Sequence, residues 1–147
     1  MKKLIYIVIL LVVVVGIAGC GSKQQGATVK IDNTIYNVEV VKSYNDKKVG
    51  LSNHTNLAEN NGMIFVYDDK AVRGFWMKDM DFNIDIIWID DNIIKHIEHN
   101  VPKPKSEDKD LPVYKPQVAV NYVLEIPAED SKKYQMSEGD QVEISLP

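Results

Sequence analysis

The side chains best suited to chemistry in this chain are two carboxylates, Asp85 and Glu125, which lie inside runs of apolar residues. A carboxylate in an apolar strand needs a partner, because burying it alone is costly. Trp76, Lys78 and Arg73 precede Asp85 in the same aromatic stretch. Two carboxylates with a lysine beside an aromatic platform could hold a sugar or a peptide, or act as general acid and base.

The same residues also allow a structural role. If the strands on either side of the intervening turn pair, Asp85 comes close to Lys78 or Arg73. A later strand would add Glu125 to this cluster. A buried ion pair would then fix the turn, since Lys and Arg are the usual partners of a desolvated carboxylate. We expect Asp85 to be structural and Glu125 to carry more of any function.

These residues belong to the stretch Gly62–Asp90, which holds the densest aromatic and β-branched residues after the N-terminal leader. Charged or Asn-bearing turns interrupt its apolar runs, as is typical of short strands. The last run is apolar on both alternating faces, which indicates a central strand with Ile86 and Trp88 on one buried face. The predicted strands are Met63–Tyr67, Gly74–Met80 and Ile84–Asp90.

The rest of the domain alternates short apolar runs with turn residues. Asp32-Asn33 favours a tight hairpin turn, and Asn45 or Asp46 is the expected N-cap of a helix that contains Gly50. Further strands are predicted at Thr28–Ile31, Thr34–Val41, Ile93–Val101, Val118–Ile126 and Gln141–Leu146, and short helices at Tyr44–Asn53 and Glu129–Gln135. Many short strands with one or two small helices predict a mainly β domain, an antiparallel sandwich or barrel.

The segment 100–117 carries Pro102, Pro104, Pro112 and Pro116 among charged residues. Proline cannot donate to a sheet ladder, and the segment is too long to be a bare connector. We therefore expect either a lid over a binding site or a disordered loop.

The N-terminus has a charged start, an apolar run and a small-residue end. The apolar run from Leu4 to Gly19 follows Met1-Lys2-Lys3 and is about sixteen residues long, slightly short of the roughly twenty that span a bilayer. It closes with Ile17-Ala18-Gly19-Cys20, which resembles the lipobox of bacterial lipoproteins. In such proteins the Cys thiol takes a diacylglycerol before cleavage on its amino side.

We therefore predict a signal peptide over 1–19, a lipidated, palmitate-bearing Cys20 with a flexible tether over 20–27, and a single domain over 28–147. The alternative is a retained transmembrane anchor. In both cases the domain would be held by membrane lipid at the extracytoplasmic face of the cell membrane.

Composition narrows the possible functions. Cys20 is the only cysteine, so an exported domain would have neither an internal disulfide nor a cysteine nucleophile. Without the leader the chain has fifteen basic and twenty-one acidic residues, a net charge of minus six, which argues against nucleic acid as a partner. His96 and His99 lie three residues apart on a predicted strand and should point to opposite faces. The sequence predicts no metal and no cofactor.

Seven short motifs occur together in an order that matches a known family. They are Gly50-Leu51, Leu57, Gly62-Met63-Ile64-Phe65, Phe75-Trp76-Met77-Lys78, Ile84-Asp85-Ile86, Val123-Leu124-Glu125-Ile126 and Gly139-Asp140. Over about residues 35–146 the chain resembles the domain of unknown function 192 family. The resemblance implies a compact, mainly β fold with sandwich-like topology, often exported or lipid-anchored in bacteria, and no established activity. The chain departs from the family pattern at Asp79-Met80, where Asn-Thr is usual, and at Asn83, where Pro is usual.

Three functions from different classes fit these observations. We favour a membrane-anchored envelope lipoprotein that binds an unidentified ligand or protein under the proline-rich segment. Its site would consist of Trp76, Lys78, Asp85, Glu125 and Arg73. The second function is a small envelope hydrolase that uses the carboxylate pair, and the third is a structural interaction module with a flat surface. A concavity would favour the first two, and the separation and burial of the carboxylates would distinguish a binder from an enzyme.

The anchor can be tested with one substitution. Cys20→Ala should block lipidation and leave an uncleaved precursor, because no other thiol can accept the lipid. Metabolic labelling with a fatty-acid analogue, followed by electrophoresis, measures both effects. Label retained in the Cys20→Ala protein would exclude the lipoprotein assignment.

Overall fold

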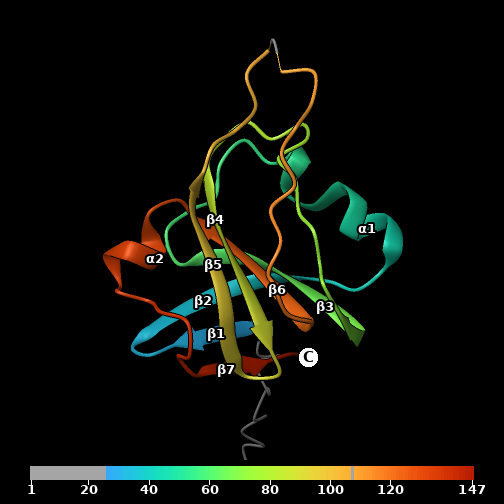
Figure 1. Cartoon of the computed structure of the whole chain (residues 1–147). Helices are drawn as coiled ribbons and strands as arrows, with labels where there is room; N and C mark the ends of the chain where they lie inside the picture. Colours follow the sequence, from blue (N-terminus) through green and yellow to red (C-terminus); the bar gives the residue numbers. More distant parts are fainter. Residues whose placement is uncertain (1–25, 107) are drawn as a thin grey trace, which may run out of the picture.

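The computed structural model describes residues 26–106 and 108–147 (Figure 1). Its strands are β1 (Thr28–Ile31), β2 (Thr34–Val41), β3 (Asn61–Ala71), β4 (Ile84–Asp90), β5 (Ile93–Val101), β6 (Val120–Pro127) and β7 (Val142–Ser145). Its helices are α1 (Tyr44–Val49), the 3-10 helix η1 (Gly50–Asn53) and α2 (Asp130–Lys133). The seven strands form one sheet in the order β5-β4-β6-β3-β2-β1-β7. Neighbouring strands are antiparallel except β2 and β3, which are parallel.

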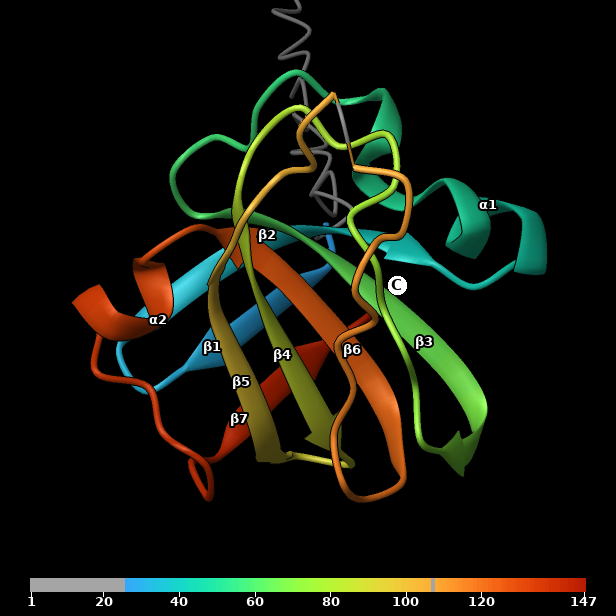
Figure 2. The same ribbon diagram turned by 45° about the horizontal axis from the view of Figure 1, so that its top comes forward.

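The sheet curls so that its two edge strands approach each other at one end (Figure 2). The N–H of Ile94 donates to the carbonyl of Asp140 at 3.0 Å, and the N–H of Val142 donates to the carbonyl of Asn92 at 2.8 Å. The start of β5 therefore contacts the segment that leads into β7. The result is a half-barrel with an inner and an outer face, which confirms the predicted mainly β, barrel-like fold with short helices.

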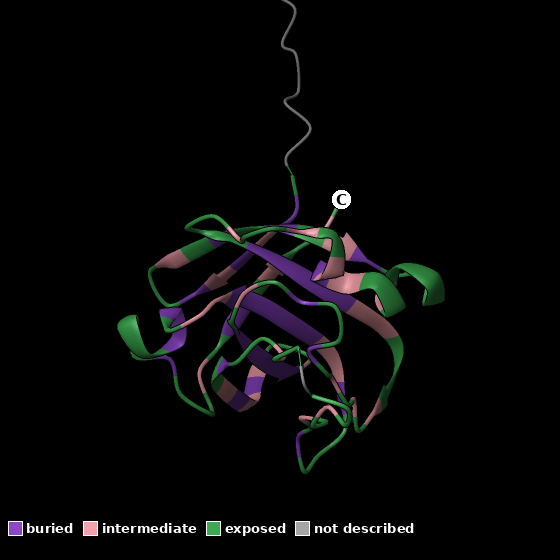
Figure 3. Ribbon diagram, turned by 90° about the horizontal axis from the view of Figure 1, so that it is seen from above, coloured by how far each residue is buried: buried purple, intermediate pink, exposed green. Residues whose placement is uncertain are grey.

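The strands in the middle of the sheet bury both of their faces. We call the cluster inside the half-barrel the inner core; it includes Ile87, Ile89, Leu124 and Ile126. The cluster on the other face, the outer core, includes Met63, Phe65, Ile86, Trp88 and Val123. Figure 3 shows the buried central strands surrounded by mostly exposed loops. The predicted burial of Ile86 and Trp88 on one face of a central strand is confirmed.

In the part of the chain that the structure describes, helices and loops cover the outer core. Leu51 packs onto it from η1, and Met77 and Met80 pack onto it from the segment 72–83. Phe75 exchanges two backbone hydrogen bonds of 2.8 Å with Tyr114, which ties this segment to the proline-rich segment. The cover of the outer core is therefore made of irregular backbone.

The strand predicted over Gly74–Met80 is wrong. In this stretch the ladder is reduced to the isolated bridge at Phe75. Met77 and Met80 are buried, whereas Trp76 and Lys78 are exposed. The apolar residues of this run cover a sheet instead of extending one, and local composition does not distinguish these two roles.

The other element boundaries agree with the prediction at most positions. Strands β1, β2, β4 and β5 begin and end where predicted. Strand β3 extends beyond the predicted Met63–Tyr67 at both ends, β6 is shifted slightly towards the C-terminus, and β7 is shorter. The predicted first helix divides at Gly50, whose φ of 51° ends α1. Its N-cap is Ser43, whose side-chain oxygen accepts from the N–H of Asp46 at 3.1 Å. The predicted N-cap at Asn45 or Asp46 is therefore wrong.

The helices of the described part of the chain are too short and too polar to cross a membrane. The predicted signal peptide, lipobox and most of the predicted tether lie outside the described residues.

Trp88 should make a large contribution to stability, and Trp76 a small one. Trp88 is fully buried, and its Nε1–H donates to the carbonyl of Arg73 at 2.7 Å. We expect Trp88→Ala to lower the free energy of unfolding by about 3–5 kcal/mol. Trp76→Ala is the matched control and should cost less than about 1 kcal/mol, because half of its surface is exposed. Urea titration measures both changes, and similar losses for the two variants would contradict this assignment.

Candidate functional site

Asp85 is a fully buried carboxylate near the start of β4. Its register partner on β6 is Ile126, a residue of the inner core. It accepts hydrogen bonds from the backbone N–H groups of Asn100 at 2.7 Å, Glu129 at 3.0 Å and Ser131 at 2.8 Å, and from the Ser131 hydroxyl. Four donors replace the water that burial removes, so a cationic partner is unnecessary. Asp85 thereby ties β4 to β5 and to α2.

The contact predicted between Asp85 and Lys78 or Arg73 is therefore wrong. Arg73 forms an ion pair with Asp69 at 2.6 Å, and Lys78 is exposed beside Trp76. The prediction depended on a paired strand at 74–80, which the structure lacks. The stabilising partners of Asp85 come from backbone groups that local sequence patterns do not reveal.

Ser131 lies between Asp85 and His99, but these three residues are not arranged for nucleophilic catalysis. The Ser131 hydroxyl donates to the Asp85 carboxylate, and His99 Nδ1 lies 2.6 Å from the same hydroxyl oxygen. Since a carboxylate can only accept, the protonated Nδ1 of His99 donates to Ser131. A catalytic serine instead gives its proton to the imidazole and has an accessible oxygen. Ser131 is completely buried, so this cluster is structural.

Glu125 lies on the opposite face of the sheet from Asp85. Its register partners are Ile86 on β4 and Met63 on β3, which both belong to the outer core. Successive side chains of a strand point to opposite faces, so the sheet separates the two carboxylates. The prediction that they act as an acid and base pair is wrong for this reason.

Gly62 brings β3 close to β6 at this position. A Cβ atom on Gly62 would lie 2.8 Å from the carbonyl oxygen of Glu125, closer than real Cβ contacts allow. The absence of a side chain here lets the backbone beside Glu125 be packed tightly.

The Glu125 side chain has almost no contact with water and lacks a hydrogen-bond partner for one oxygen. The residue is 5% exposed, and its Oε2 atom has no partner among the residues that the structure describes. Burial raises the pKa of Glu125 from 4.5 to about 8, because the charged form loses its hydration. At neutral pH the group is therefore predominantly the neutral acid, which offers one donor and one acceptor.

A hollow of about 100 Å³ is lined by Glu125, and we call it the Glu125 hollow. Its walls come from α1, η1, β3 and the segment 72–83. Its aromatic lining residues include Tyr67, Phe75 and Trp76, and its basic lining residues are Lys47, Lys48 and Lys78. A buried acid thus lies beside an aromatic and basic opening.

Contacts among α1, η1, β3 and the segment 72–83 hold this hollow in shape. The ammonium group of Lys47, from α1, lies 4.1 Å from the centroid of the Tyr67 ring, and the guanidinium of Arg73 lies 4.0 Å from it. The Ser52 hydroxyl of η1 donates to the carbonyl of Lys78 at 3.1 Å. Arg73 therefore supports the Tyr67 wall and does not itself line the hollow.

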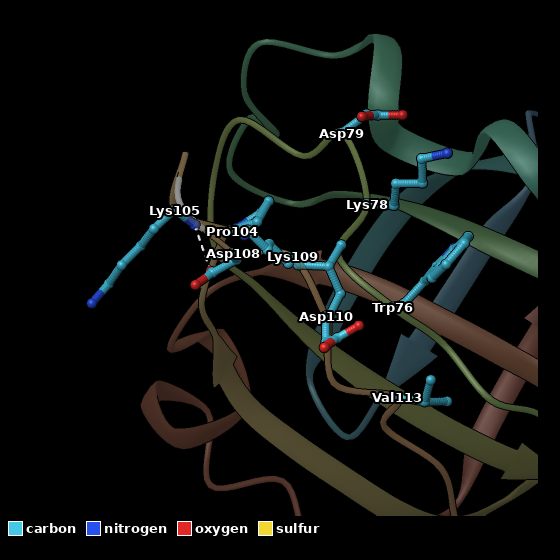
Figure 4. Close-up of a pocket in the computed structure, with 10 residues that line it drawn as sticks. Trp76, Lys78, Asp79, Pro104, Lys105, Asp108, Lys109, Asp110 and Val113 are labelled. Atoms are coloured by element: carbon cyan, nitrogen blue, oxygen red, sulfur yellow. Dashed lines mark hydrogen bonds between the residues drawn. The ribbon is translucent and has the colours of Figure 1, made fainter.

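Two larger hollows share Trp76 and Lys78 with the Glu125 hollow. One has about 270 Å³ and reaches from Trp76 towards α1 and η1. The other has about 600 Å³ and is bounded by the proline-rich segment. Figure 4 shows Asp108 and Asp110 of that segment across from Trp76 and Lys78. The proline-rich segment thus forms one wall of the site.

Of the predicted site residues, the structure brings together Trp76, Lys78 and Glu125. Lys47, Lys48 and Tyr67 also line the hollow and were not predicted as site residues. Alternation along β3 places Tyr67 on the same face as Met63 and Phe65, so its direction was accessible from the sequence. The position of Lys47 depends on where α1 packs, and no local sequence pattern predicts this packing.

In residues 26–106 and 108–147, no three metal-ligating side chains converge. His96 contacts Glu98 at 3.1 Å and Glu138 at 3.0 Å, whereas His99 contacts Ser131. The two histidines therefore have separate partners.

The fold and this hollow define a small, mainly β domain with a buried acid beneath an aromatic and basic opening. The family model of DUF192, described as "Uncharacterized ACR", matches residues 27–144, so the chain belongs to the DUF192 family. No curated protein gives a significant match.

Two solved structures share the fold. A protein of unknown function from Novosphingobium aromaticivorans has a TM-score of 0.70 and 24% sequence identity, covering 80% of this chain and 82% of its own. A protein from Sinorhizobium meliloti, described as a proposed transcription regulator, has a TM-score of 0.71 and 23% identity, covering 80% of this chain and 91% of its own. At these identities the similarity establishes the fold alone.

Asp85→Asn should be strongly destabilising. The amide nitrogen replaces one acceptor oxygen and faces N–H groups that need an acceptor, so we expect a loss on the order of 3 kcal/mol. Asp81→Asn, an exposed aspartate near β4, is the matched control and should change stability by less than about 0.5 kcal/mol. Urea titration at pH 7 compares them. Equal stability of the two variants would show that the four hydrogen bonds of Asp85 contribute little.

Glu125 should make stability depend on pH in the opposite sense to an ordinary paired carboxylate. Between about pH 4.5 and about pH 8 the folded state keeps a proton that the unfolded state releases, so stability falls as the pH rises through this range. Glu125→Gln should remove this fall. We expect the variant to match the wild type at pH 4.5 and to exceed it by roughly 2–4 kcal/mol at pH 8.5. Urea titrations at both pH values test this, and a difference that does not change with pH would refute it.

Proposed function

We propose that this protein is a ligand-binding module that is lipid-anchored at the extracytoplasmic face of the cell membrane, with the Glu125 hollow at the centre of its binding site. The observation that carries the binding proposal is the Oε2 atom of Glu125, which is buried and without a partner in the described chain, in a residue that lines an open hollow. Leaving a buried polar group unsatisfied costs about 1–3 kcal/mol. A ligand that forms a hydrogen bond there would recover part of this cost.

The surface around Glu125 also favours a binding module over a flat interaction surface. Trp76 is 51% exposed, so part of its indole ring is accessible to a ligand. The ammonium group of Lys78 lies 5.6 Å from the centroid of the Trp76 ring, so a charge and an apolar face are presented together. A few polar groups beside aromatic walls are typical of small-molecule sites.

The support for the anchor comes from the N-terminal sequence. A charged start, an apolar run and Ile17-Ala18-Gly19-Cys20 follow one another in the order of a lipoprotein signal. A domain that begins at Thr28 would then stand a few residues from the lipid on Cys20. Its partners would be the membrane lipid and a ligand of the cell envelope.

The two tryptophans allow a direct test of ligand binding. We would record the indole N–H signals of the full-length protein in detergent micelles while adding a library of sugars, peptides, nucleotides and lipid headgroups. A ligand of this site should shift the signal of Trp76. The signal of Trp88 should stay nearly unchanged, because its indole is buried and its N–H donates to the carbonyl of Arg73. A library in which no member shifts the Trp76 signal would overturn the proposal.

Variants of Glu125 sharpen this test. Glu125→Gln keeps a neutral donor and acceptor in the hollow, so affinity for a library ligand should change by less than about threefold. Glu125→Leu removes both polar atoms and should weaken binding about tenfold or more. Unchanged affinity in Glu125→Leu would show that the ligand does not reach Glu125.

A further inference from the structure

We propose that the ligand is an acidic carbohydrate, whose sugar ring lies on the Trp76 indole and whose carboxylate or phosphate group lies among three lysines. This inference rests on the proposed binding function and names the chemical class of the ligand. The lysines are Lys47, Lys48 and Lys78.

The charge of the opening supports an anionic group on the ligand. In the part of the chain that the structure describes, none of these three lysines forms an ion pair, whereas Lys30, Lys70, Lys132 and Lys133 do. The whole chain is nevertheless acidic, with a net charge of −4. Three uncompensated ammonium groups at one opening of an acidic protein create a local positive potential that attracts an anion.

The acidic residues near the opening do not cancel this potential. Asp79, Asp108 and Asp110 line the largest hollow, where Lys78, Lys105 and Lys109 balance their charge. None of these aspartates lines the Glu125 hollow. Asp46 of α1 lines none of the three hollows. Glu125 itself is predominantly neutral at pH 7, because burial raises its pKa to about 8. An anionic ligand would therefore meet little repulsion at the base of the site.

Trp76 supports a sugar ring as the body of the ligand. Its exposed indole face carries the negative side of the ring quadrupole. The C–H groups of a sugar are partly positive because each carbon carries an oxygen, so they are attracted to such a face. The hydroxyl groups of the same ring both donate and accept hydrogen bonds, as the neutral acid of Glu125 does.

The sizes of the hollows indicate more than one sugar unit. The Glu125 hollow, about 100 Å³, is smaller than the roughly 300 Å³ at which ordinary ligand pockets begin. It would hold one substituent, such as a hydroxymethyl group, while the body of the ligand lies outside it. The adjoining hollows of about 270 Å³ and about 600 Å³ both include Trp76 and Lys78. An oligosaccharide can occupy such a branched surface with Trp76 at its centre.

Three probes distinguish the contribution of the sugar ring to affinity from that of the charge. We would titrate full-length protein in detergent micelles with trigalacturonic acid, which has both features, with maltotriose, which has only the sugar, and with triglutamate peptide, which has only the charge. The Trp76 indole signal is the readout and Trp88 the internal reference. Trigalacturonic acid should bind at least about tenfold more tightly than either of the other probes. Galacturonic acid and glucose 6-phosphate, compared at equal concentration, distinguish carboxylate from phosphate, and preference for either supports the proposal.

Lysine variants test the position of the acidic group. The double substitution Lys47→Gln and Lys78→Gln should weaken trigalacturonic acid about tenfold or more and maltotriose by a much smaller factor. Lys132→Gln, on α2 at the other side of the molecule, is the matched control and should have no effect (Figure 1). Raising NaCl from about 50 to about 500 mM should weaken binding of trigalacturonic acid and leave that of maltotriose unchanged, because salt screens exposed charges.

Several outcomes would overturn this inference. They are equal affinity for trigalacturonic acid and maltotriose, equal affinity for the acidic sugar and the acidic peptide, and no shift of Trp76 with any acidic sugar. If a different class of compound then shifts Trp76 in the library experiment, the binding function stands and only the ligand class is wrong. If no compound does, both proposals fail.

Discussion

The alternation of side chains between two separate cores is the constraint on which the rest of this structure depends. On β4, Ile86 and Trp88 face the outer core and Ile87 and Ile89 face the inner core, so neither face of the strand is free for solvent. A step of one residue along a strand therefore moves a side chain into a different environment. Ile86 pairs with Glu125 in the register, and Asp85 lies one step before Ile86, so Asp85 faces the inner core and Glu125 faces the outer core.

The two sides of the sheet accommodate their buried carboxyl groups in different ways. The inner side supplies backbone donors from β5 and α2, and these satisfy Asp85 with hydrogen bonds. The outer side is covered by irregular segments whose side chains leave a hollow beside Glu125. The acid there is held neutral by desolvation, and its buried Oε2 has no partner among the described residues, which is costly. A position that is costly for the fold and adjacent to an opening is the kind of place at which function is expected.

Much of the sheet was predictable from the sequence, because period-two alternation and turn residues are local signals. The strands at Thr28–Ile31, Thr34–Val41, Ile84–Asp90 and Ile93–Val101 follow from them. The run Phe75-Trp76-Met77 gives the same local signal and yet forms no strand, since its role is decided by the distant core that it covers. The backbone donors of Asp85 and the approach of Lys47 to Tyr67 depend on tertiary packing, which a single sequence does not encode in any short window.

The pairing of β1 with β7 joins the two ends of the domain, because Thr28 lies opposite Ser145 in the register. Strand β1 thus has one neighbour close in sequence and another more than a hundred residues away. Pairings of this kind slow folding, because the entropy of closing a long loop is lost before the contact contributes any stability. A chain that emerges from its N-terminus onward must therefore leave one edge of β1 open until the last residues are available. An unpaired edge is a template for association with other chains. Loss of a short C-terminal segment would therefore expose β1 to aggregation, although the residues of the site would all still be present.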